Sequence, residues 1–552
     1  MRKSSTTGAA CAPPAPQAAA GERAQVAFVG TGPGDPGLLT LRAAELLGRA
    51  DVVLLDRIDS AEIIRRHCRD DARIVPPPAL AIPEVLPAPT PESLQCERVL
   101  DALHSLDGGG LVVRLMSGDP GVFTCLLQEC SALTAEGVPF EVVPGVTSLS
   151  AVPLYAGIPL TSPESPRLHL LDTSLRHDLG DSARDDVTVV MMGTPGRLVE
   201  QLSSLLEAGR DPGTTVALTD HGTTALQHTS TTSLGDAAHV LDHLDDDAQL
   251  LAIVGRTVPL RTSMSWFENK PLFGWRVLVP RTKEQAGGIS ARLEHYGAIP
   301  TVVPTISIEP PRTPQQMDKA ITGLVAGRYE WVGFTSVNAV RAVREKFDEY
   351  GLDVRSFAGL RVAAVGGATS AALREWGLVP DLVPSGEQSA AGLLEEWPPY
   401  DALLDPIDRV FLPRADIATE TLVAGLQDMG WEVEDVTAYR TVRAAPPAAD
   451  VREAIKAGDF DAVVFTSSST VRNLVGIAGK PHRGTVVACI GQATARTAEE
   501  HGLRVDVIAG EASGDSLVDG LAEFGHAQAR AAYEAGEPVV LPSKRRRRRR
   551  SS

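Results

Sequence analysis

Short apolar runs, each followed by a loop rich in glycine, proline, serine or threonine, recur along the whole chain. Residues 25–29 form such a run and lead through the loop at 30–37 into a helical pattern at 38–50. Residues 111–115 form another, followed by a loop at 117–123. A buried strand, a loop and a helix are the repeating unit of α/β proteins. The pattern predicts an α/β fold with ligands at the carboxyl ends of parallel strands.

The second half of the chain contains an internal repeat. Arg-Val-(Leu/Phe)-(Val/Leu)-Pro-Arg begins at both Arg276 and Arg409, and residues 329–340 are echoed by residues 460–471. Residues 362–369 reappear as residues 487–494. Each echo has the form strand, loop, helix. We therefore expect two similar lobes built on doubly wound parallel sheets.

No such repeat occurs upstream of residue 266, so residues 266–274 are interpreted as the junction of two fused proteins. The predicted organisation is a disordered leader at 1–24, a first domain at 25–265, the junction, a second domain at 275–525 whose middle lobe covers about 310–435, and a disordered tail at 526–552. A length of 552 residues is ample for several hydrophobic cores.

Composition narrows the classes of function. The net charge of −18 argues against nucleic acid as a partner, although seven basic residues follow one another at 544–550. Such a run is usually a solvated tail. The six cysteines include no C-x-x-C pair, which predicts reduced thiols, a cytoplasmic protein and no metal site. No apolar stretch is long enough for a membrane helix, and the start has no signal-peptide pattern.

The loop at 30–37 looks at first like a dinucleotide-binding fingerprint. Asp35 stands where the third glycine of that fingerprint belongs, and two prolines stiffen the loop. A carboxylate at a helix start repels a pyrophosphate. A neutral or cationic ligand fits this loop better.

The first half resembles the S-adenosylmethionine-dependent tetrapyrrole methyltransferases, specifically uroporphyrinogen-III C-methyltransferases. Gly-Pro-Gly-Asp-Pro at 32–36 and Val-Pro-Gly-Val-Thr-Ser at 143–148 carry the likeness, which covers about residues 25–270. The resemblance implies a two-lobed fold with S-adenosylmethionine between the lobes, and a tendency to form homodimers. By motif match the cofactor would contact Pro33, Ser117, Gly118, Asp119, Val122, Thr147, Ser148, Met192 and Gly222.

Asp56 matches the family's proposed proton acceptor, and the alternative role for it is a helix N-cap after a strand. Several positions depart from the family pattern. Leu55 replaces a tyrosine, Ser117 replaces a glycine, and residues 124–129 replace a Gly-Arg-Gly-Gly-Glu-Glu run. A basic segment expected near residues 75–78, with a catalytic lysine, is missing. Methyltransferase activity is therefore a weaker expectation than the fold.

The second half resembles uroporphyrinogen-III synthase from about residue 273 to 524. Phe-Thr-Ser twice, Ala-Tyr-Arg-Thr at 438–441 and Ile-Gly-Gln-Ala-Thr at 490–494 carry the likeness. It implies two flavodoxin-like lobes joined by a two-stranded ladder, with crossings at 302–309 and 435–442. Tyr439 would assist departure of hydroxide. The hydroxyls expected to bind substrate, each of which could instead cap a helix, are Thr335, Ser336, Thr369, Ser467, Ser468, Ser469 and Thr494.

The two resemblances together predict a bifunctional tetrapyrrole enzyme. The second half would close hydroxymethylbilane to uroporphyrinogen III with inversion of ring D, without a cofactor, and the first would methylate that product to precorrin-2. One alternative is an active synthase fused to a degenerate methyltransferase domain. Another, from a different class, is a two-lobed solute-binding or sensory protein.

Overall fold

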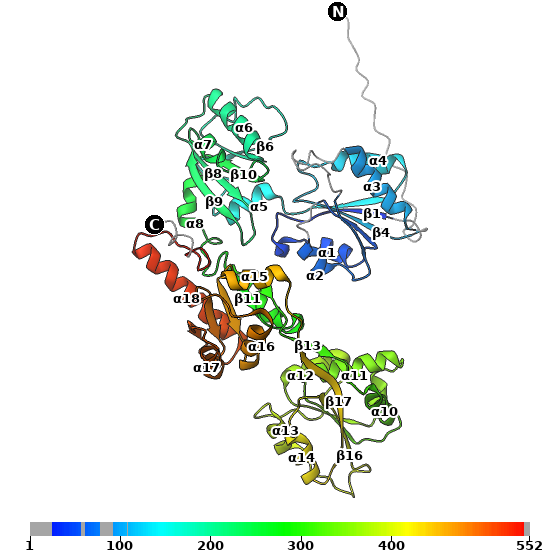
Figure 1. Cartoon of the computed structure of the whole chain (residues 1–552). Coiled ribbons are helices and arrows are strands. Elements are labelled where there is room, and N and C mark those ends of the chain that lie inside the picture. Colours follow the sequence, from blue (N-terminus) through cyan, green and yellow to red (C-terminus); the bar gives the residue numbers. More distant parts are fainter. Residues whose placement is uncertain (1–24, 57–60, 78–91, 107–108, 546–552) are drawn as a thin grey trace, which may run out of the picture. The chain divides into compact units, whose positions relative to one another are not determined.

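The computed structural model describes residues 25–56, 61–77, 92–106 and 109–545. The chain divides after Gly274 into two compact units, with residues 296–298 belonging to the first. Each unit contains two five-stranded sheets (Figure 1). In the described part of the chain, no helix is long and apolar enough to cross a membrane.

The first sheet of unit 1 is entirely parallel, in the order β3-β2-β4-β1-β5. Its strands are β1 (Gln25–Gly30), β2 (Val52–Leu54), β3 (Arg73–Val75), β4 (Leu111–Met116) and β5 (Phe140–Val143). Helices α1 (Leu41–Leu47) and α2 (Ala61–His67) cover one face, and α3 (Glu92–His104) and α4 (Leu126–Ala135) cover the other (Figure 1). Both faces are apolar because each is buried under helices.

The second sheet of unit 1 is mixed, in the order β6-β7-β10-β8-β9. Strands β6 and β7 are parallel, whereas β10 runs antiparallel to β7 and β8, and β9 antiparallel to β8. The elements are α5 (Ser148–Tyr155), β6 (Arg167–Asp172), β7 (Val187–Gly193), α6 (Pro195–Glu207), β8 (Thr215–Asp220), β9 (His228–Ser233), α7 (Ala237–Leu241), β10 (Leu250–Val254) and α8 (Arg261–Met264).

The first sheet of unit 2 is parallel, in the order β12-β11-β18-β19-β20, and we call its domain the split lobe because its strands come from both ends of the unit. This is the flavodoxin-like order 2-1-3-4-5. The elements are β11 (Arg276–Val279), α9 (Lys283–His295), β12 (Ile299–Val302), α15 (Ala449–Ala457), β18 (Ala462–Phe465), α16 (Ser468–Ala478), β19 (Val486–Cys489), α17 (Gln492–Glu500), β20 (Val507–Ile508) and α18 (Gly514–Glu534).

The remaining sheet belongs to what we call the inserted lobe, in the order β13-β17-β16-β14-β15. Strand β13 pairs antiparallel with β17, so that Ile306 lies opposite Arg443 and Glu309 opposite Arg440. The elements are β13 (Ile306–Glu309), α10 (Pro314–Val325), β14 (Trp331–Phe334), α11 (Val337–Glu349), β15 (Arg361–Ala364), α12 (Gly367–Trp376), α13 (Ala390–Glu396), β16 (Arg409–Ala415), α14 (Thr421–Asp428) and β17 (Glu432–Arg443). The β13–β17 pair is the predicted ladder, and the predicted fold class is confirmed.

The structure corrects the prediction of a disordered tail from residue 526. Helix α18 continues to Glu534, and the chain then returns to the split lobe, where Pro542 is buried and the Ser543 amide donates a 2.9 Å hydrogen bond to Asp461. Alanine and glutamate in residues 526–534 favour a helix. Residues 1–24 and 546–552, for which disorder was also predicted, lie outside the described residues.

Candidate active sites

Three loops meet at the carboxyl edge of the parallel sheet in unit 1. They follow β1, β4 and β5, and the amides of Gly32 and Gly118 exchange hydrogen bonds with each other's carbonyls at 3.2 and 3.0 Å. A Cβ on Gly30 would lie 2.6 Å from the Gly145 backbone, and one on Gly145 would overlap the Gly118 carbonyl oxygen. Glycine is therefore required where the backbones of these loops touch.

A fourth loop, after β8, joins the first three. The Asp35 amide donates to the Thr223 hydroxyl at 3.1 Å, and the Tyr155 hydroxyl donates to the Asp35 carboxylate at 2.8 Å. Phe123, His221 and Thr223 all adopt positive φ angles, a strained conformation for residues other than glycine. Sequence reasoning found that Asp35 is wrong for a pyrophosphate. In the structure, Asp35 instead connects the loop after β1 to α5 and to the loop after β8 through these two hydrogen bonds.

Most of the residues predicted to contact the cofactor lie on these loops. Ser117 is exposed and Pro33, Asp119, Thr147 and Ser148 are half-buried, so all five retain surface for a ligand. Both carboxylate oxygens of Asp119 already accept backbone amides, from Gly121 at 2.7 Å and from Gly145 at 3.0 Å. Asp119 therefore organises its loop whatever else it binds.

The other residues predicted to contact the cofactor, Val122, Gly222 and Met192, differ in burial and in what they could offer a ligand. Val122 packs on the apolar cluster around Leu149. A Cβ on Gly222 would collide with Val152, so this position brings backbone rather than a side chain to the site. Met192 lies at the end of β7, two strands from β8, with a side chain that is 40% exposed.

Asp56 follows β2 at the same edge of the sheet and belongs to a cluster of charges. Arg114, 1% exposed, donates to Asp56 at 3.1 Å and to both carboxylate oxygens of Glu129 at 3.2 Å. Burial by itself lowers the pKa of the Arg114 guanidinium, but the carboxylates of Glu129 and Asp56 outweigh burial and the pKa is raised. Arg114 fixes the position of Asp56, a role that sequence reasoning missed. An arginine inside the apolar run 111–115 is the signal for a buried ion pair.

One position that departs from the family pattern, Cys125, also joins this cluster. Cys125 donates from its thiol to Glu129 at 2.8 Å. Burial, together with the hydrogen bond to Glu129, raises the pKa of the Cys125 thiol to about 12. Where the family has an arginine, this chain therefore has a neutral thiol.

Tyr439 is the centre of the candidate site in the inserted lobe. It is 7% exposed, and its hydroxyl lies 2.9 Å from the Ser336 hydroxyl. Ser336 also caps α11 by accepting the Ala339 amide at 3.1 Å. Predicted residues 103 positions apart thus meet beside the carboxyl end of β14.

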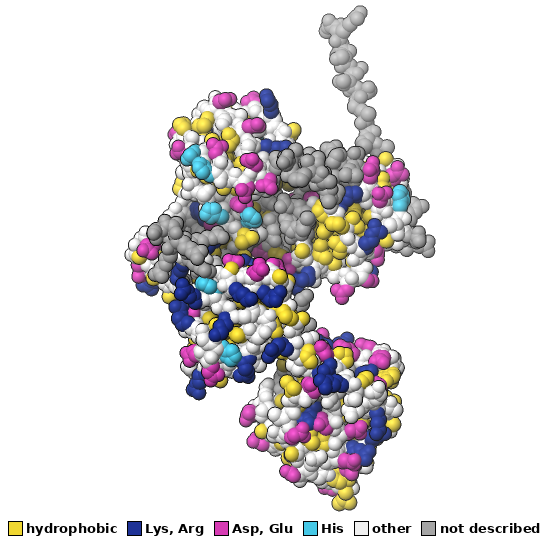
Figure 2. All heavy atoms as spheres, viewed as in Figure 1, with side chains coloured by type: hydrophobic (Ala, Val, Ile, Leu, Met, Phe, Trp, Pro, Cys, Tyr) yellow, Lys and Arg dark blue, Asp and Glu magenta, His cyan; other side chains and the backbone are white. Residues whose placement is uncertain are grey.

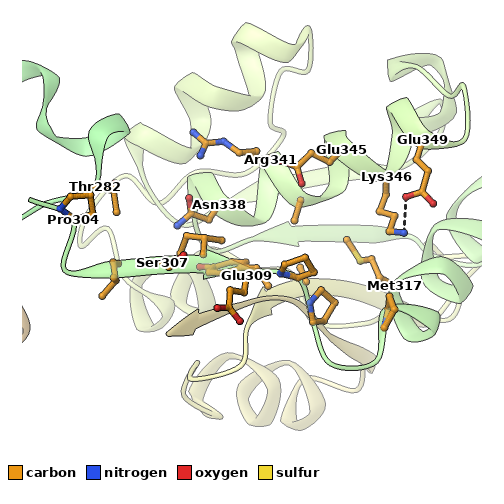
Figure 3. A pocket seen from close by; sticks show the side chains of 18 residues that line it. Thr282, Pro304, Ser307, Glu309, Met317, Asn338, Arg341, Glu345, Lys346 and Glu349 are labelled. Atoms are coloured by element: carbon orange, nitrogen blue, oxygen red, sulfur yellow. Dashed lines mark hydrogen bonds and ion pairs between the residues drawn. The ribbon is translucent and has the colours of Figure 1, made fainter. Parts of the chain in front are cut away.

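Tyr439 lines a pocket of about 590 Å³ between β13, α10, α11 and β17. Asn338, Arg341 and Glu345 come from α11, and Ser307 and Glu309 from β13 (Figure 3). Lys346 is paired with Asp318 and Glu349, and Glu309 with Arg440. Arg341 is exposed, and no described residue forms an ion pair with it. Glu345, also exposed, has no ion-pair partner among the described residues either, so Arg341 can bind an anion here only beside this carboxylate.

The other predicted substrate-binding residues of unit 2 fall into two groups. Ser467 caps α16, its hydroxyl lies 2.8 Å from that of Ser469, and Ser468 donates to the Ala493 carbonyl at 3.1 Å. These hydroxyls are exposed or half-buried at the carboxyl end of β18, and Thr335 is half-buried at the end of β14. Thr369 and Thr494 are only 5% and 4% exposed, which is more typical of packing than of ligand contact.

Each of the two α/β units has polar loops gathered at the carboxyl ends of parallel strands, where α/β enzymes bind their ligands, so each unit has a candidate active site. A family model described as tetrapyrrole (corrin/porphyrin) methylases matches residues 25–238, and one described as uroporphyrinogen-III synthase HemD matches residues 288–519. The porphyrin biosynthesis protein HemD of Ruminiclostridium josui is 31% identical over 520 residues, which cover 91% of this chain and 99% of that protein.

Two further comparisons cover only part of the chain. Siroheme synthase of Azotobacter vinelandii is 38% identical over 254 residues, or 45% of this chain and 53% of that protein. The crystal structure of native uroporphyrin III C-methyl transferase from Thermus thermophilus aligns with 43% of this chain and 94% of that chain, at 31% identity and a TM-score of 0.35.

The chain is an enzyme of tetrapyrrole biosynthesis. It belongs to the family in which a tetrapyrrole methylase is fused to a uroporphyrinogen-III synthase. Both resemblances seen in the sequence are thereby confirmed. A degenerate methyltransferase domain and a solute-binding or sensory protein are not favoured by these matches.

Proposed function

We propose that the two units catalyse successive reactions. Unit 2 closes hydroxymethylbilane to uroporphyrinogen III with inversion of ring D, and unit 1 methylates uroporphyrinogen III to precorrin-2, on the route to sirohaem or cobalamin. The observation that carries the proposal is the Tyr439 hydroxyl, held 2.9 Å from Ser336 on the wall of a pocket of about 590 Å³.

In unit 2 the Tyr439 hydroxyl donates a proton to the departing hydroxide, which leaves as water. Ser336 orients that hydroxyl. The resulting cation is attacked by a pyrrole carbon of the same chain, so the enzyme has only to hold the substrate in the folded conformation. Basic side chains gather on the visible face of the lobe that carries α15, α16 and α17, which suits a substrate with eight carboxylates (Figure 2).

In unit 1 the site fits S-adenosylmethionine because it combines exposed apolar side chains, Phe123 on the loop after β4 and Met192 near the end of β7, with the polar groups of Ser117, Thr147 and Ser148. The cofactor supplies an electrophilic methyl group. Asp56, positioned by Arg114, then accepts the proton released from the methylated pyrrole carbon.

The decisive experiment supplies the purified chain with hydroxymethylbilane, with and without S-adenosylmethionine, and identifies the products by chromatography and mass. We expect uroporphyrinogen III without cofactor and a dimethylated product with it. Isomer I alone in both reactions would refute the synthase, and isomer III alone in both would refute the methylation. An Asp56→Ala variant is expected to stop at uroporphyrinogen III, whereas Asp71→Ala, at an exposed carboxylate, serves as the control.

We also propose a cytoplasmic homodimer formed through unit 1. The five cysteines of the described residues are free thiols, as a reducing compartment allows. Light scattering of the purified chain should give twice the mass of 58.4 kDa.

A further inference from the structure

The two lobes of unit 2 repeat one pair of parallel strands in the same register. In the split lobe β11 pairs with β12, and Val279 lies opposite Val302. In the inserted lobe β16 pairs with β17, and Leu412 lies opposite Asp435. In both lobes a proline and an arginine follow this position, so Arg281 and Arg414 are equivalent.

Arg414 is neutralised inside its own lobe. It is 5% exposed and forms a bidentate pair with Asp435. It also donates to the Thr419 carbonyl at 2.6 Å and to Glu420 at 3.2 Å. These partners, two of them carboxylates, leave it no capacity for a further one.

Arg281 has no equivalent of this ion pair, because Val302 stands where the inserted lobe has Asp435. Its side chain is half-buried, and none of the residues that the structure describes forms an ion pair with it. Burial lowers the pKa of its guanidinium, and no acidic side chain that the structure describes acts in the opposite direction. A partly desolvated cation without a partner is costly, so such groups are typical of sites that await an anion.

The position of Arg281 is that of a ligand-binding group. It follows the carboxyl end of β11, and β18, with Ser467–Ser469 after it, is the neighbouring strand. The order β12-β11-β18 places the topological switch point of a doubly wound sheet between these two strand ends. The adjacent residue, Thr282, lines the same pocket as Tyr439.

We propose that Arg281 binds a carboxylate of the acyclic tetrapyrrole substrate, and that Val302 keeps its guanidinium free to do so. A planar guanidinium binds a carboxylate through two parallel hydrogen bonds. The acetate and propionate groups of hydroxymethylbilane supply such carboxylates. This inference rests on the proposed synthase reaction of unit 2.

The test compares Arg281→Gln, Val302→Asp and the double variant in the full chain, measuring kcat and KM for hydroxymethylbilane. We expect Arg281→Gln to raise KM about tenfold or more, with kcat within about threefold of the parent enzyme. Val302→Asp should also raise KM, because the new carboxylate would pair with Arg281 as Asp435 pairs with Arg414. The double variant should be no worse than Arg281→Gln alone, since the two changes remove the same interaction.

Controls separate this inference from the proposed function. Arg355→Gln changes an arginine that is 88% exposed and forms an ion pair with Asp353, so KM should not change. Thermal melting of each variant verifies folding. If the parent enzyme makes no uroporphyrinogen III, the proposed function fails. If the parent enzyme does make it and folded Arg281→Gln keeps the parent KM, or if the Val302→Asp effect persists in full without Arg281, this inference alone is overturned.

Discussion

At the scale of single residues, both sites depend on side chains held by groups far away in the chain. Asp56 is fixed by Arg114, 58 residues later, and Tyr439 by Ser336, 103 residues earlier. In each case the reactive group is half-buried or buried and its partner fixes its orientation. A candidate catalytic group placed in this way loses little entropy when substrate binds.

Replacing Tyr439 by phenylalanine removes only the hydroxyl proposed to act as the acid. We expect kcat for uroporphyrinogen III formation to fall about 10- to 100-fold, while KM changes less than about threefold. Chromatographic assay of the isomer III product measures both constants. Tyr533→Phe, at a side chain that is 84% exposed on α18, should leave both unchanged. Equal loss in the two variants would contradict an acid role for Tyr439.

The ionisation of the Cys125 thiol provides a test of the charge cluster formed by Arg114, Asp56 and Glu129. The raised pKa, about 12, means that the thiolate fraction at pH 8 is about 10⁻⁴. Removing the negative charge of Glu129 in Glu129→Gln favours the thiolate, so the pKa should fall and alkylation by iodoacetamide at pH 8 should become faster. Mass spectrometry of the Cys125 peptide reports the rate. An unchanged rate would show that Glu129 does not act on this thiol.

At the scale of strands, loops and helices, the sequence was a good guide wherever the information is local. Apolar runs ended by glycine and proline predicted the strands and the loops at their carboxyl ends, because both patterns depend on neighbouring residues. The pairing of Arg114 with Asp56 could not be predicted in the same way. It depends on β2 and β4 being neighbours in the sheet, which is a property of topology.

The same limit applies to the repeat in unit 2. The Val-Pro-Arg segment at 279–281 and the Leu-Pro-Arg segment at 412–414 were visible in the sequence, but the difference that matters lies on other strands, at Val302 and Asp435. Register had to be known before the two arginines could be compared. For the end of α18, in contrast, the signal is local, because the alanine-rich residues 526–534 favour a helix by themselves.

The contact between the three glycine loops of unit 1 leads to a test of the cofactor site. Gly145→Ala would push the β5 loop away from Gly118 and Gly30. We expect S-adenosylmethionine to bind at least about tenfold more weakly, as measured by calorimetry, with synthase activity unchanged. Gly196→Ala on α6, where a Cβ would meet nothing within 4 Å, should leave binding intact. Normal binding by Gly145→Ala would place the cofactor elsewhere.

At the scale of the whole molecule, the division into two units has a thermodynamic consequence. Each unit has its own buried clusters, so each should unfold in its own transition. S-adenosylmethionine at 100 times its dissociation constant should raise one transition temperature by about 5 to 10 °C and leave the other unchanged. Differential scanning calorimetry measures this. A shift of both transitions together would show that the units unfold as one.

The insertion of one lobe of unit 2 into the other, at the ladder of β13 and β17, also affects folding during synthesis of the chain. Within unit 2, strands β11 and β12 leave the ribosome first, but their neighbour β18 begins only at Ala462, after the whole inserted lobe. At ordinary translation speeds these about 160 residues take roughly 10 to 30 s to synthesise. The inserted lobe can fold during that wait, whereas the first two strands of the split lobe cannot yet be enclosed. A chain truncated before residue 462 and released from the ribosome should therefore contain a folded inserted lobe beside an apolar segment on which chaperones act.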